Sequence, residues 1–173
     1  LLTPKINNNI NNLKELLREL TRVKIPHKKG KKIHYTNVYK GDIFIADLDN
    51  GLDVVLEFEE DLTLDHRMII FEMSQKFDDI IRISHRKSAF LEAETIIEKS
   101  KPYIKIDDIS VYVPAGTFLQ ASKEAETALI NLVKKYIGNH TGKIADLFSG
   151  VGTFSYPLSK NKKNQILAVD SSK

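Results

Sequence analysis

The spacing of apolar residues predicts an amphipathic helix at the start of the chain. Thr3 and Pro4 have the residue types of a helix N-cap and first turn, and Pro26 closes the segment. Between them, apolar side chains recur at helical spacing: Ile6, Ile10, Leu13, Leu16, Leu17 and Leu20. One stripe of this helix is therefore expected to pack against a core.

Runs rich in β-formers dominate the next stretch. Two of them, 33–39 and 43–48, precede Asp49-Asn50-Gly51, a strong hairpin signal that leads into a further strand over 52–58. The pattern predicts a β-meander over 32–58.

A second helix and more strands complete the first part of the chain. Thr63 is expected to cap a helix with Leu64, Met68 and Phe71 on one face. Strand-like runs follow at 80–84, 95–98 and 103–113. Residues 1–113 are therefore predicted to form an α+β central domain.

The period of the pattern changes after Pro114. Ser122 is expected to cap a helix that Gly138 ends, and its predicted core stripe is Ala125, Ala128, Leu129, Leu132, Val133 and Tyr136. A buried strand over 143–148, a glycine turn, a short helix near 154–159 and a strand over 165–170 follow. This order is the start of a doubly wound α/β domain, so residues 114–173 are predicted to form an incomplete one.

A parallel sheet of only two strands leaves edges and an apolar face that further elements normally cover. We therefore expect the C-terminal portion to be marginally stable unless a complementing chain or self-association covers it.

Composition narrows the classes of function. The 173 residues are 42% apolar, enough for a core, and their net charge of +3 mildly favours a polyanionic partner. The absence of cysteine excludes disulfides, thiolate metal sites and a thiol nucleophile from these residues. The five histidines show no metal-ligand spacing, so no metal is expected.

Neither a membrane-length apolar run nor a secretory signal is present, which favours a cytoplasmic protein without membrane contact. The first residue is Leu1 rather than Met, which favours a chain cut from something longer.

The glycine turn is the segment with the clearest chemistry. Gly150 and Gly152 follow a strand and precede a helix, and Asp170 ends the next strand. Glycines allow close backbone approach to a nucleotide-like ligand, and a carboxylate in that position can accept hydrogen bonds from two ribose hydroxyls. Ser155 replaces the third glycine of a dinucleotide motif. Asp146 would repel a pyrophosphate but attract a methionine ammonium. These two details favour S-adenosylmethionine, with a merely structural turn as the alternative.

Two motifs together resemble a known family. Residues 114–122, Pro-Ala-Gly-Thr-Phe-Leu-Gln-Ala-Ser, precede a helix, and Asp-Leu-Phe-Ser-Gly-Val-Gly-Thr-Phe follows at 146–154. This pair is similar to the uracil-C5 RNA methyltransferases, which use S-adenosylmethionine to make 5-methyluridine in ribosomal and transfer RNA; the Gly51-Leu52-Asp53 hairpin and the Lys101-Pro102-Tyr103 segment also resemble the central domain of this family.

The resemblance implies a role for several side chains. Gln120 would contact the cofactor, Phe148 and Thr153 would line its pocket, and Asp170 would bind the ribose. Structural alternatives remain: Gln120 as a cap of local backbone, Phe148 as core and Thr153 as a helix N-cap.

The catalytic part of the family pattern is missing. The resemblance implies a cysteine that adds to uracil C6 and a carboxylate base that removes the C5 proton, and both would lie beyond Lys173. No residue of this chain is therefore nominated as catalytic, and the chain is expected to be truncated and inactive alone. An RNA-binding barrel and an iron–sulfur cluster, which many members carry at the N-terminus, are also not seen.

Two basic runs and two rival functions remain. Either run could meet RNA phosphates or be a solvated loop, and the first has no interleaved aromatic for base stacking. The runs are Lys24, His27, Lys28, Lys29, Lys31 and Lys32, and then Arg82, His85, Arg86 and Lys87.

Beside a methyltransferase acting on ribosomal or transfer RNA, the alternatives are a non-catalytic remnant that binds RNA and a fragment of a nicotinamide-dependent oxidoreductase.

Overall fold

The computed structural model describes residues 2–38, 40–120 and 122–171. Contacts within the chain divide it into two compact units, Leu1–Pro102 and Tyr103–Lys173, and each is described by itself. Two residues within predicted features lie outside the described ranges. They are Tyr39, at the end of the run 33–39, and Ala121, in the segment 114–122.

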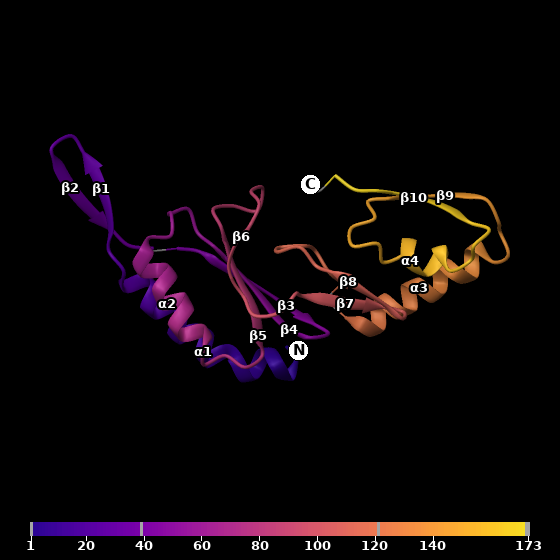
Figure 1. Cartoon of the computed structure of the whole chain (residues 1–173), viewed down its shortest axis with the longest axis horizontal. Helices are drawn as coiled ribbons and strands as arrows, with labels where there is room; N and C mark the ends of the chain where they lie inside the picture. Colours follow the sequence, from indigo (N-terminus) through magenta and orange to yellow (C-terminus); the bar gives the residue numbers. More distant parts are fainter. Residues whose placement is uncertain (1, 39, 121, 172–173) are drawn as a thin grey trace. The chain divides into compact units, whose positions relative to one another are not determined.

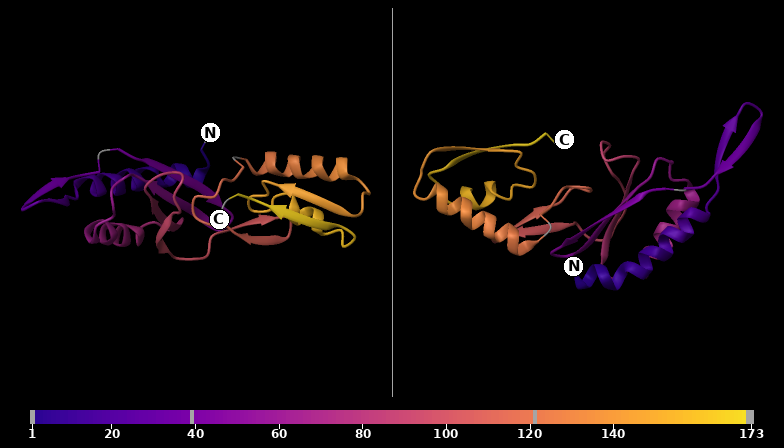
Figure 2. Two further views of the ribbon diagram at one scale, coloured as in Figure 1. Left: turned by 90° about the horizontal axis from the view of Figure 1, so that it is seen from above. Right: turned by 180° about the vertical axis from the view of Figure 1, so that it is seen from behind.

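The first unit is a mixed four-stranded sheet with two helices and a separate hairpin (Figure 1). Its elements are α1 (Pro4–Arg22), β1 (Ile25–Lys29), β2 (Lys32–Thr36), β3 (Asp42–Leu48), β4 (Gly51–Glu57), α2 (Leu64–Ser74), β5 (Ile80–Arg86) and β6 (Glu94–Glu98). The sheet order is β3-β4-β5-β6; β4 and β5 are parallel and the outer pairs are antiparallel. Helices α1 and α2 lie on the same face of this sheet (Figures 1 and 2).

The first helix forms as predicted. The Thr3 hydroxyl accepts a hydrogen bond from the Ile6 amide, and Pro4 occupies the first turn, where its missing N–H costs nothing. Leu13, Leu16 and Leu20 are buried in the core, with Leu16 fully inaccessible. Burial of this stripe against the sheet, rather than helix propensity, therefore stabilises α1.

The meander predicted over 32–58 is wrong in its first strand. β2 pairs with β1, so the two form their own antiparallel sheet, and β3 begins a new one with β4. The two-residue turn Gly30-Lys31 explains this pairing, because Gly30 takes the left-handed φ of +65° that a tight hairpin needs. The hairpin predicted at 49–51 is confirmed.

The face predicted for α2 is also the wrong one. Leu64, Met68 and Phe71 are exposed, and the buried side chains of the helix are His66, Ile70, Met73 and Ser74. His66 turns inward because it completes the helix cap: Thr63 N donates to its Nδ1 at 3.2 Å. Ile70 and Met73 follow His66 at helical spacing and lie in the core, so the face that packs inward begins with the capping histidine.

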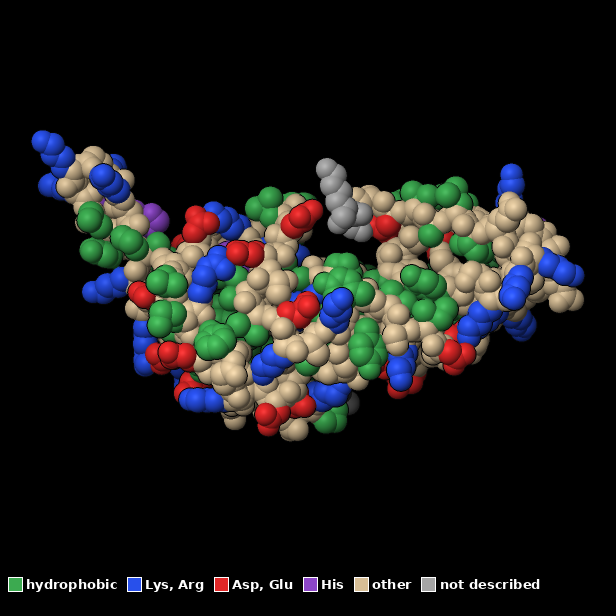
Figure 3. Space-filling model, in the orientation of Figure 1, with side chains coloured by type: hydrophobic (Ala, Val, Ile, Leu, Met, Phe, Trp, Pro, Cys, Tyr) green, Lys and Arg blue, Asp and Glu red, His purple; other side chains and the backbone are tan. Residues whose placement is uncertain are grey.

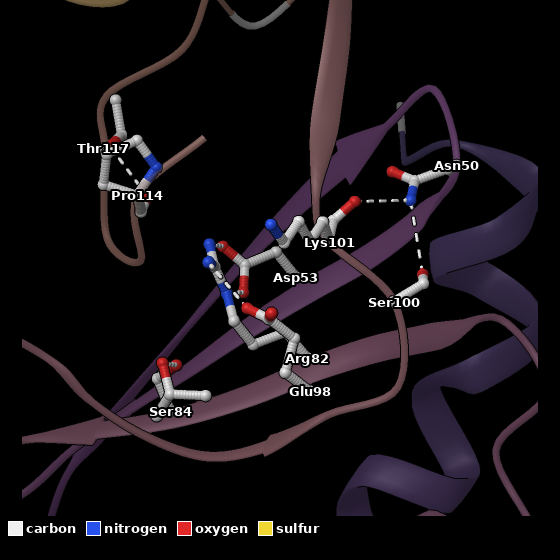
Figure 4. Close-up of polar contacts among 10 residues, drawn as sticks. Asn50, Asp53, Arg82, Ser84, Glu98, Ser100, Lys101, Pro114 and Thr117 are labelled. Atoms are coloured by element: carbon white, nitrogen blue, oxygen red, sulfur yellow. Dashed lines mark hydrogen bonds and ion pairs between the residues drawn. The ribbon is translucent and has the colours of Figure 1, made fainter. Parts of the chain in front are cut away.

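A buried ion pair ties three strands of the sheet together (Figure 4). Arg82 on β5 donates from Nε to Asp53 Oδ1 at 2.8 Å and from Nη2 to Asp53 Oδ2 at 2.7 Å. Glu98 Oε2 on β6 lies 3.6 Å from Arg82 Nη1. The fork of two parallel bonds fixes the register of β4 against β5, because slipping the register would leave a buried charge unpaired.

The second unit contains a hairpin, two helices and a parallel strand pair. Its elements are β7 (Tyr103–Ile106), β8 (Ile109–Tyr112), α3 (Lys123–Ile137), β9 (Lys143–Leu147), α4 (Ser155–Ser159) and β10 (Gln165–Val169). The run predicted as one strand over 103–113 is instead a hairpin, which turns at Asp107 with φ +52°. The contacts group this hairpin with the second unit, whereas the sequence grouped it with the first.

The strand, glycine turn, helix, strand order is confirmed, with β9 and β10 parallel. Ser122 caps α3 and Gly138 ends it, as predicted. The core stripe predicted for α3 is wrong: Leu129, Leu132 and Tyr136 are exposed, and Glu126 and Ile130 are the buried residues. The strand over 143–147 is not buried either. Two strands present too little surface to cover the whole apolar stripe of a four-turn helix.

We predict that Leu16→Ala destabilises the first unit by about 2–5 kcal/mol, because it removes a fully buried side chain and leaves a cavity. Leu64→Ala is the matched control: Leu64 is also helical but 71% exposed, and its loss should change the free energy of unfolding by less than about 0.5 kcal/mol. Urea unfolding followed by circular dichroism measures both. Equal effects would show that the assigned faces of α1 and α2 are wrong.

Acid should destabilise the first unit through its two buried histidines. Burial lowers the pKa of His66 and of His85 below the ordinary 6.5. The unfolded rings therefore protonate first as the pH falls, so stability is full above about pH 6.5 and declines below it. The urea midpoint should be lower at about pH 5.5 than at about pH 7.5. His66→Gln should remove part of this dependence; a pH-independent midpoint would contradict the assignment.

Candidate functional site: a cleft at the glycine turn

The turn after β9 uses three left-handed residues in five positions. Phe148, Gly150 and Gly152 have φ of +65°, +52° and +85°. The turn is fixed by backbone hydrogen bonds from Gly152 N to Ser149 O at 2.8 Å and from Ser149 N to Val169 O at 3.0 Å. A left-handed phenylalanine is uncommon and costs conformational energy, and such strain clusters at functional sites.

Gly152 is required by its surroundings as well as by its φ. A Cβ there would lie 2.7 Å from Cε2 of the Tyr156 ring. At Gly150 a Cβ would meet nothing within 4 Å, so only its left-handed φ favours glycine. Gly152 thus allows the ring of Tyr156 to pack directly on the turn.

Two carboxylates at the ends of the parallel strands hold the turn in place. The Ser155 hydroxyl, on a buried residue, donates to Asp146 Oδ2 at 2.6 Å. The Gly150 amide donates to Asp170 Oδ2 at 2.8 Å. Asp146 and Asp170 lie at the carboxyl ends of β9 and β10, where open α/β sheets bind their ligands.

The turn opens onto a cleft of about 480 Å³ within the second unit. The opposite wall comes from β8 and the segment after it, where the Thr117 hydroxyl donates to Pro114 O at 2.7 Å (Figure 4). The residues lining the cleft are Val111, Tyr112, Pro114, Thr117, Ser149, Gly150, Val151, Gly152, Ser155, Tyr156, Ser159, Ile166 and Ala168. The volume is in the range of small-molecule and cofactor sites.

The predicted site residues relate to this cleft in different ways. Gly150 and Gly152 line it, whereas Gln120, Asp146, Phe148, Thr153 and Asp170 are not among its lining residues. Phe148 is 84% exposed, so its alternative as a core residue is wrong. Phe154, not Thr153, precedes α4, so the N-cap alternative for Thr153 is wrong as well.

Sequence reasoning missed the wall opposite the glycine turn. Val111 and Tyr112 lie on β8, which the sequence presented as part of one long strand with no link to the turn. The usable signal was that Pro114 and Thr117 belong to the motif 114–122, which carries the family resemblance. Tyr156 was missed because its role depends on the contact with Gly152.

The second basic run is neutralised inside the first unit. Arg82 is held by Asp53, Arg86 Nε lies 2.7 Å from Glu57 Oε2, and Lys87 Nζ lies 2.6 Å from Asp61 Oδ1. The hydrogen bond from Lys87 lowers the pKa of Asp61 below its ordinary value, so that carboxylate stays charged. The arginines and the lysine of this basic run are therefore engaged in internal ion pairs. An RNA-binding role for the run is not supported.

The described residues show neither a metal-binding cluster nor a membrane-spanning helix. The ranges 2–38, 40–120 and 122–171 contain no group of three or more side chains placed to hold a metal ion. Over the same part of the chain, no helix has the length and apolar character needed to cross a bilayer.

Comparison with known proteins gives sequence relatives but no family model that matches. An uncharacterized RNA methyltransferase of Agrobacterium fabrum is 35% identical over 118 residues, which are 68% of this chain and 27% of that protein. A 23S rRNA (uracil(1939)-C(5))-methyltransferase of Photobacterium profundum is 22% identical over 124 residues, 71% of this chain and 26% of that protein. The chain thus spans about a quarter of the length of these relatives.

A solved structure shares the fold. The tRNA (uracil-54, C5)-methyltransferase of Pyrococcus abyssi, crystallised with S-adenosyl-L-homocysteine, superposes with a TM-score of 0.59 at 18% identity. The similarity covers 94% of this chain and 39% of that one. At this identity it shows a common mixed α/β fold.

We predict that Gly152→Ala distorts the turn more than Gly150→Ala. Both place alanine at a positive φ, which costs about 1–2 kcal/mol, but only alanine at 152 collides with Tyr156. Hydrogen exchange of the second unit should therefore rise more in Gly152→Ala. In a Tyr156→Ala background the difference between the two glycine variants should shrink, and a difference that persists unchanged would show that the ring contact is not its cause.

Proposed function

We propose that this chain, which is related in sequence to bacterial RNA methyltransferases, forms the cofactor-binding part of an S-adenosylmethionine-dependent RNA (uracil-C5) methyltransferase. The resemblance stated from its two motifs is confirmed by its sequence relatives. One observation carries the proposal: a left-handed glycine turn at the end of β9 opens onto a cleft and is flanked by a carboxylate that Ser155 fixes in place.

The residues at the cleft suit S-adenosylmethionine. Gly150 and Gly152 give a backbone that a ligand can approach closely, and Asp146 supplies a fixed negative charge for the methionine ammonium. Asp170 is the candidate for the ribose hydroxyls, and the exposed rings of Phe148 and Tyr112 are candidates for contact with the base. Gln120 and Thr153 stay in the proposal as cofactor contacts. When bound, S-adenosylmethionine supplies an electrophilic methyl group.

A nicotinamide-dependent oxidoreductase suits the same residues less well. In dinucleotide sites a third glycine lets the helix pack closely on the strand, whereas Ser155 occupies that position here. Its hydroxyl is engaged with Asp146, whose carboxylate beside the turn would repel a pyrophosphate. The geometry therefore favours a ligand with a positive end.

The proposed substrate is a uridine in ribosomal or transfer RNA. Methylation at C5 needs a thiolate nucleophile and a base, and the 173 residues contain no cysteine. These residues therefore offer a cofactor half-site without the nucleophile, and on their own they should transfer no methyl group. A non-catalytic RNA-binding role is the second candidate, favoured by the unpaired lysines of β1 and β2.

We also propose that a complementing chain or a second copy covers the second unit. Three apolar side chains of the strand pair, Leu147, Leu167 and Val169, are exposed, and so is the outer stripe of α3. In the register of β9 and β10, Leu147 lies opposite Val169. Exposed apolar side chains gathered in this way favour an interaction site.

Binding of S-adenosylhomocysteine, measured by isothermal titration calorimetry, tests the cofactor proposal. The wild-type chain should bind it, and Asp146→Asn should weaken binding by about tenfold or more, because a charge-assisted interaction is worth about 1.5–3 kcal/mol. Asp61→Asn, in the first unit and highly exposed, is the control with the same charge change and should bind normally. Displacement of the ligand by NAD, or equal affinities of both variants, would overturn the proposal.

A further inference from the structure

The β1–β2 hairpin concentrates basic side chains in a short segment. Residues 24–36 contain five lysines, two histidines and no acidic residue. Lysines elsewhere in the unit, such as Lys5 and Lys87, lie within 2.8 Å of a carboxylate oxygen. Within the described residues, none of the five hairpin lysines forms an ion pair. The hairpin therefore presents a concentrated, uncompensated positive charge.

The strand register places two of the lysines, Lys29 and Lys32, together on one face. Directly opposite residues share a face of a two-stranded sheet, and successive pairs alternate between faces. Lys29 lies opposite Lys32, and His27 lies opposite His34 on the same side. Like charges directly opposite destabilise a strand pair, so a bound polyanion would relieve a repulsion that no side chain of the described chain relieves.

The other face of the hairpin carries an aromatic platform. Tyr35 lies opposite Pro26, and Ile33 lies opposite Lys28. Tyr35 and Ile33 are 60% and 59% exposed. The linear sequence of the basic run hides this aromatic, because Tyr35 joins the lysines only through strand pairing. Lys28 shares this face with Tyr35, so a cation and a stacking ring lie together, which is the combination that single-stranded nucleic acids recognise.

The hairpin is anchored at its root and free along its length. Ile25 is buried in the core, and Asn37 Nδ2 donates to Thr21 O at 3.0 Å and to Val23 O at 3.1 Å, which fixes the exit of β2 to the end of α1. Beyond this root, β1 and β2 are exposed and form a sheet of their own. Figure 3 shows lysine side chains gathered at the tip of this projection.

We infer that the β1–β2 hairpin is an RNA-binding arm, in which Lys29 and Lys32 bind phosphates and Tyr35 stacks on an unpaired base. The choice of RNA as the polyanion rests on the proposed function. An anionic membrane is the rival partner, but Ile33 and Tyr35 are the two large apolar side chains exposed on the described arm, which is little surface for insertion among lipids.

Fluorescence anisotropy with a labelled, uridine-containing single-stranded RNA tests the arm in the full chain. Lys29→Ala/Lys32→Ala should weaken binding by about tenfold and lower the slope of log affinity against log salt by about 1.4, about 0.7 for each lost phosphate contact. Lys14→Ala/Lys76→Ala is the control: it removes the same charge from exposed sites of the same unit and should leave the slope nearly unchanged.

Tyr35→Ala separates stacking from charge. It should weaken binding by about 5-fold to 100-fold, as expected for a lost base stack, without changing the salt slope. Circular dichroism checks that each variant is folded. The inference is overturned if both arm variants bind RNA like the control variant, or if the wild-type chain binds phosphatidylglycerol vesicles and not RNA.

The test of the RNA-binding arm and the test of the cofactor site can fail independently of each other. Loss of RNA binding in the arm variants with normal S-adenosylhomocysteine binding supports both proposals. RNA binding through the arm in a chain that does not bind S-adenosylhomocysteine would retain the arm and reject the cofactor site. Binding of S-adenosylhomocysteine by a chain whose RNA affinity is unchanged in the arm variants would retain the cofactor site and reject the arm.

Discussion

The left-handed turn between β9 and α4 is the constraint on which the second unit depends. It places Phe148, Gly150 and Gly152 at positive φ within one loop and is secured to the end of β10 by the bond from the Gly150 amide to Asp170. Close packing of Tyr156 on Gly152 then sets the start of α4, where Ser155 reaches Asp146. Cleft, carboxylates and helix are thus positioned by one loop, and the cofactor proposal depends on it.

The first unit differs in charge between its sheet, where basic side chains form ion pairs, and its β1–β2 hairpin. Inside its sheet, Arg82 is enclosed by Asp53 and Glu98, and Arg86 and Lys87 at the end of β5 each have a carboxylate partner. The hairpin has lysines without such partners. A sheet that neutralises its own charges can serve as a rigid support, while the unpaired lysines remain available to an external polyanion. The two proposed sites, a cofactor cleft and an RNA arm, therefore belong to different units of the chain.

Local signals in the sequence predicted much of the fold. The caps at Thr3 and Ser122, the stop at Gly138, the hairpin at 49–51 and the glycine turn all follow from short-range chemistry, and the structure confirms them. The family resemblance rested on the same kind of local motif.

Features set by long-range pairing could not be predicted in this way. The pairing of β2 with β1 had one local signal, Gly30, but whether β2 also joins the main sheet depends on residues far along the chain. The buried face of α2 includes His66, whose capping role does not follow from apolar periodicity. The cleft wall at Tyr112 depends on a hairpin that reads as one strand. For α3, periodicity identified an apolar stripe but could not show that two strands leave it exposed.

A ¹H–¹⁵N correlation spectrum recorded during titration with S-adenosylhomocysteine tests the central claim most directly. The account predicts shifts concentrated in the amides of 146–155 and of the facing wall at 111–117, with the amides of β1 and β2 unmoved. Saturable shifts confined to other parts of the chain, or no shifts at ligand concentrations that saturate related sites, would contradict the assignment of the glycine turn as the cofactor site.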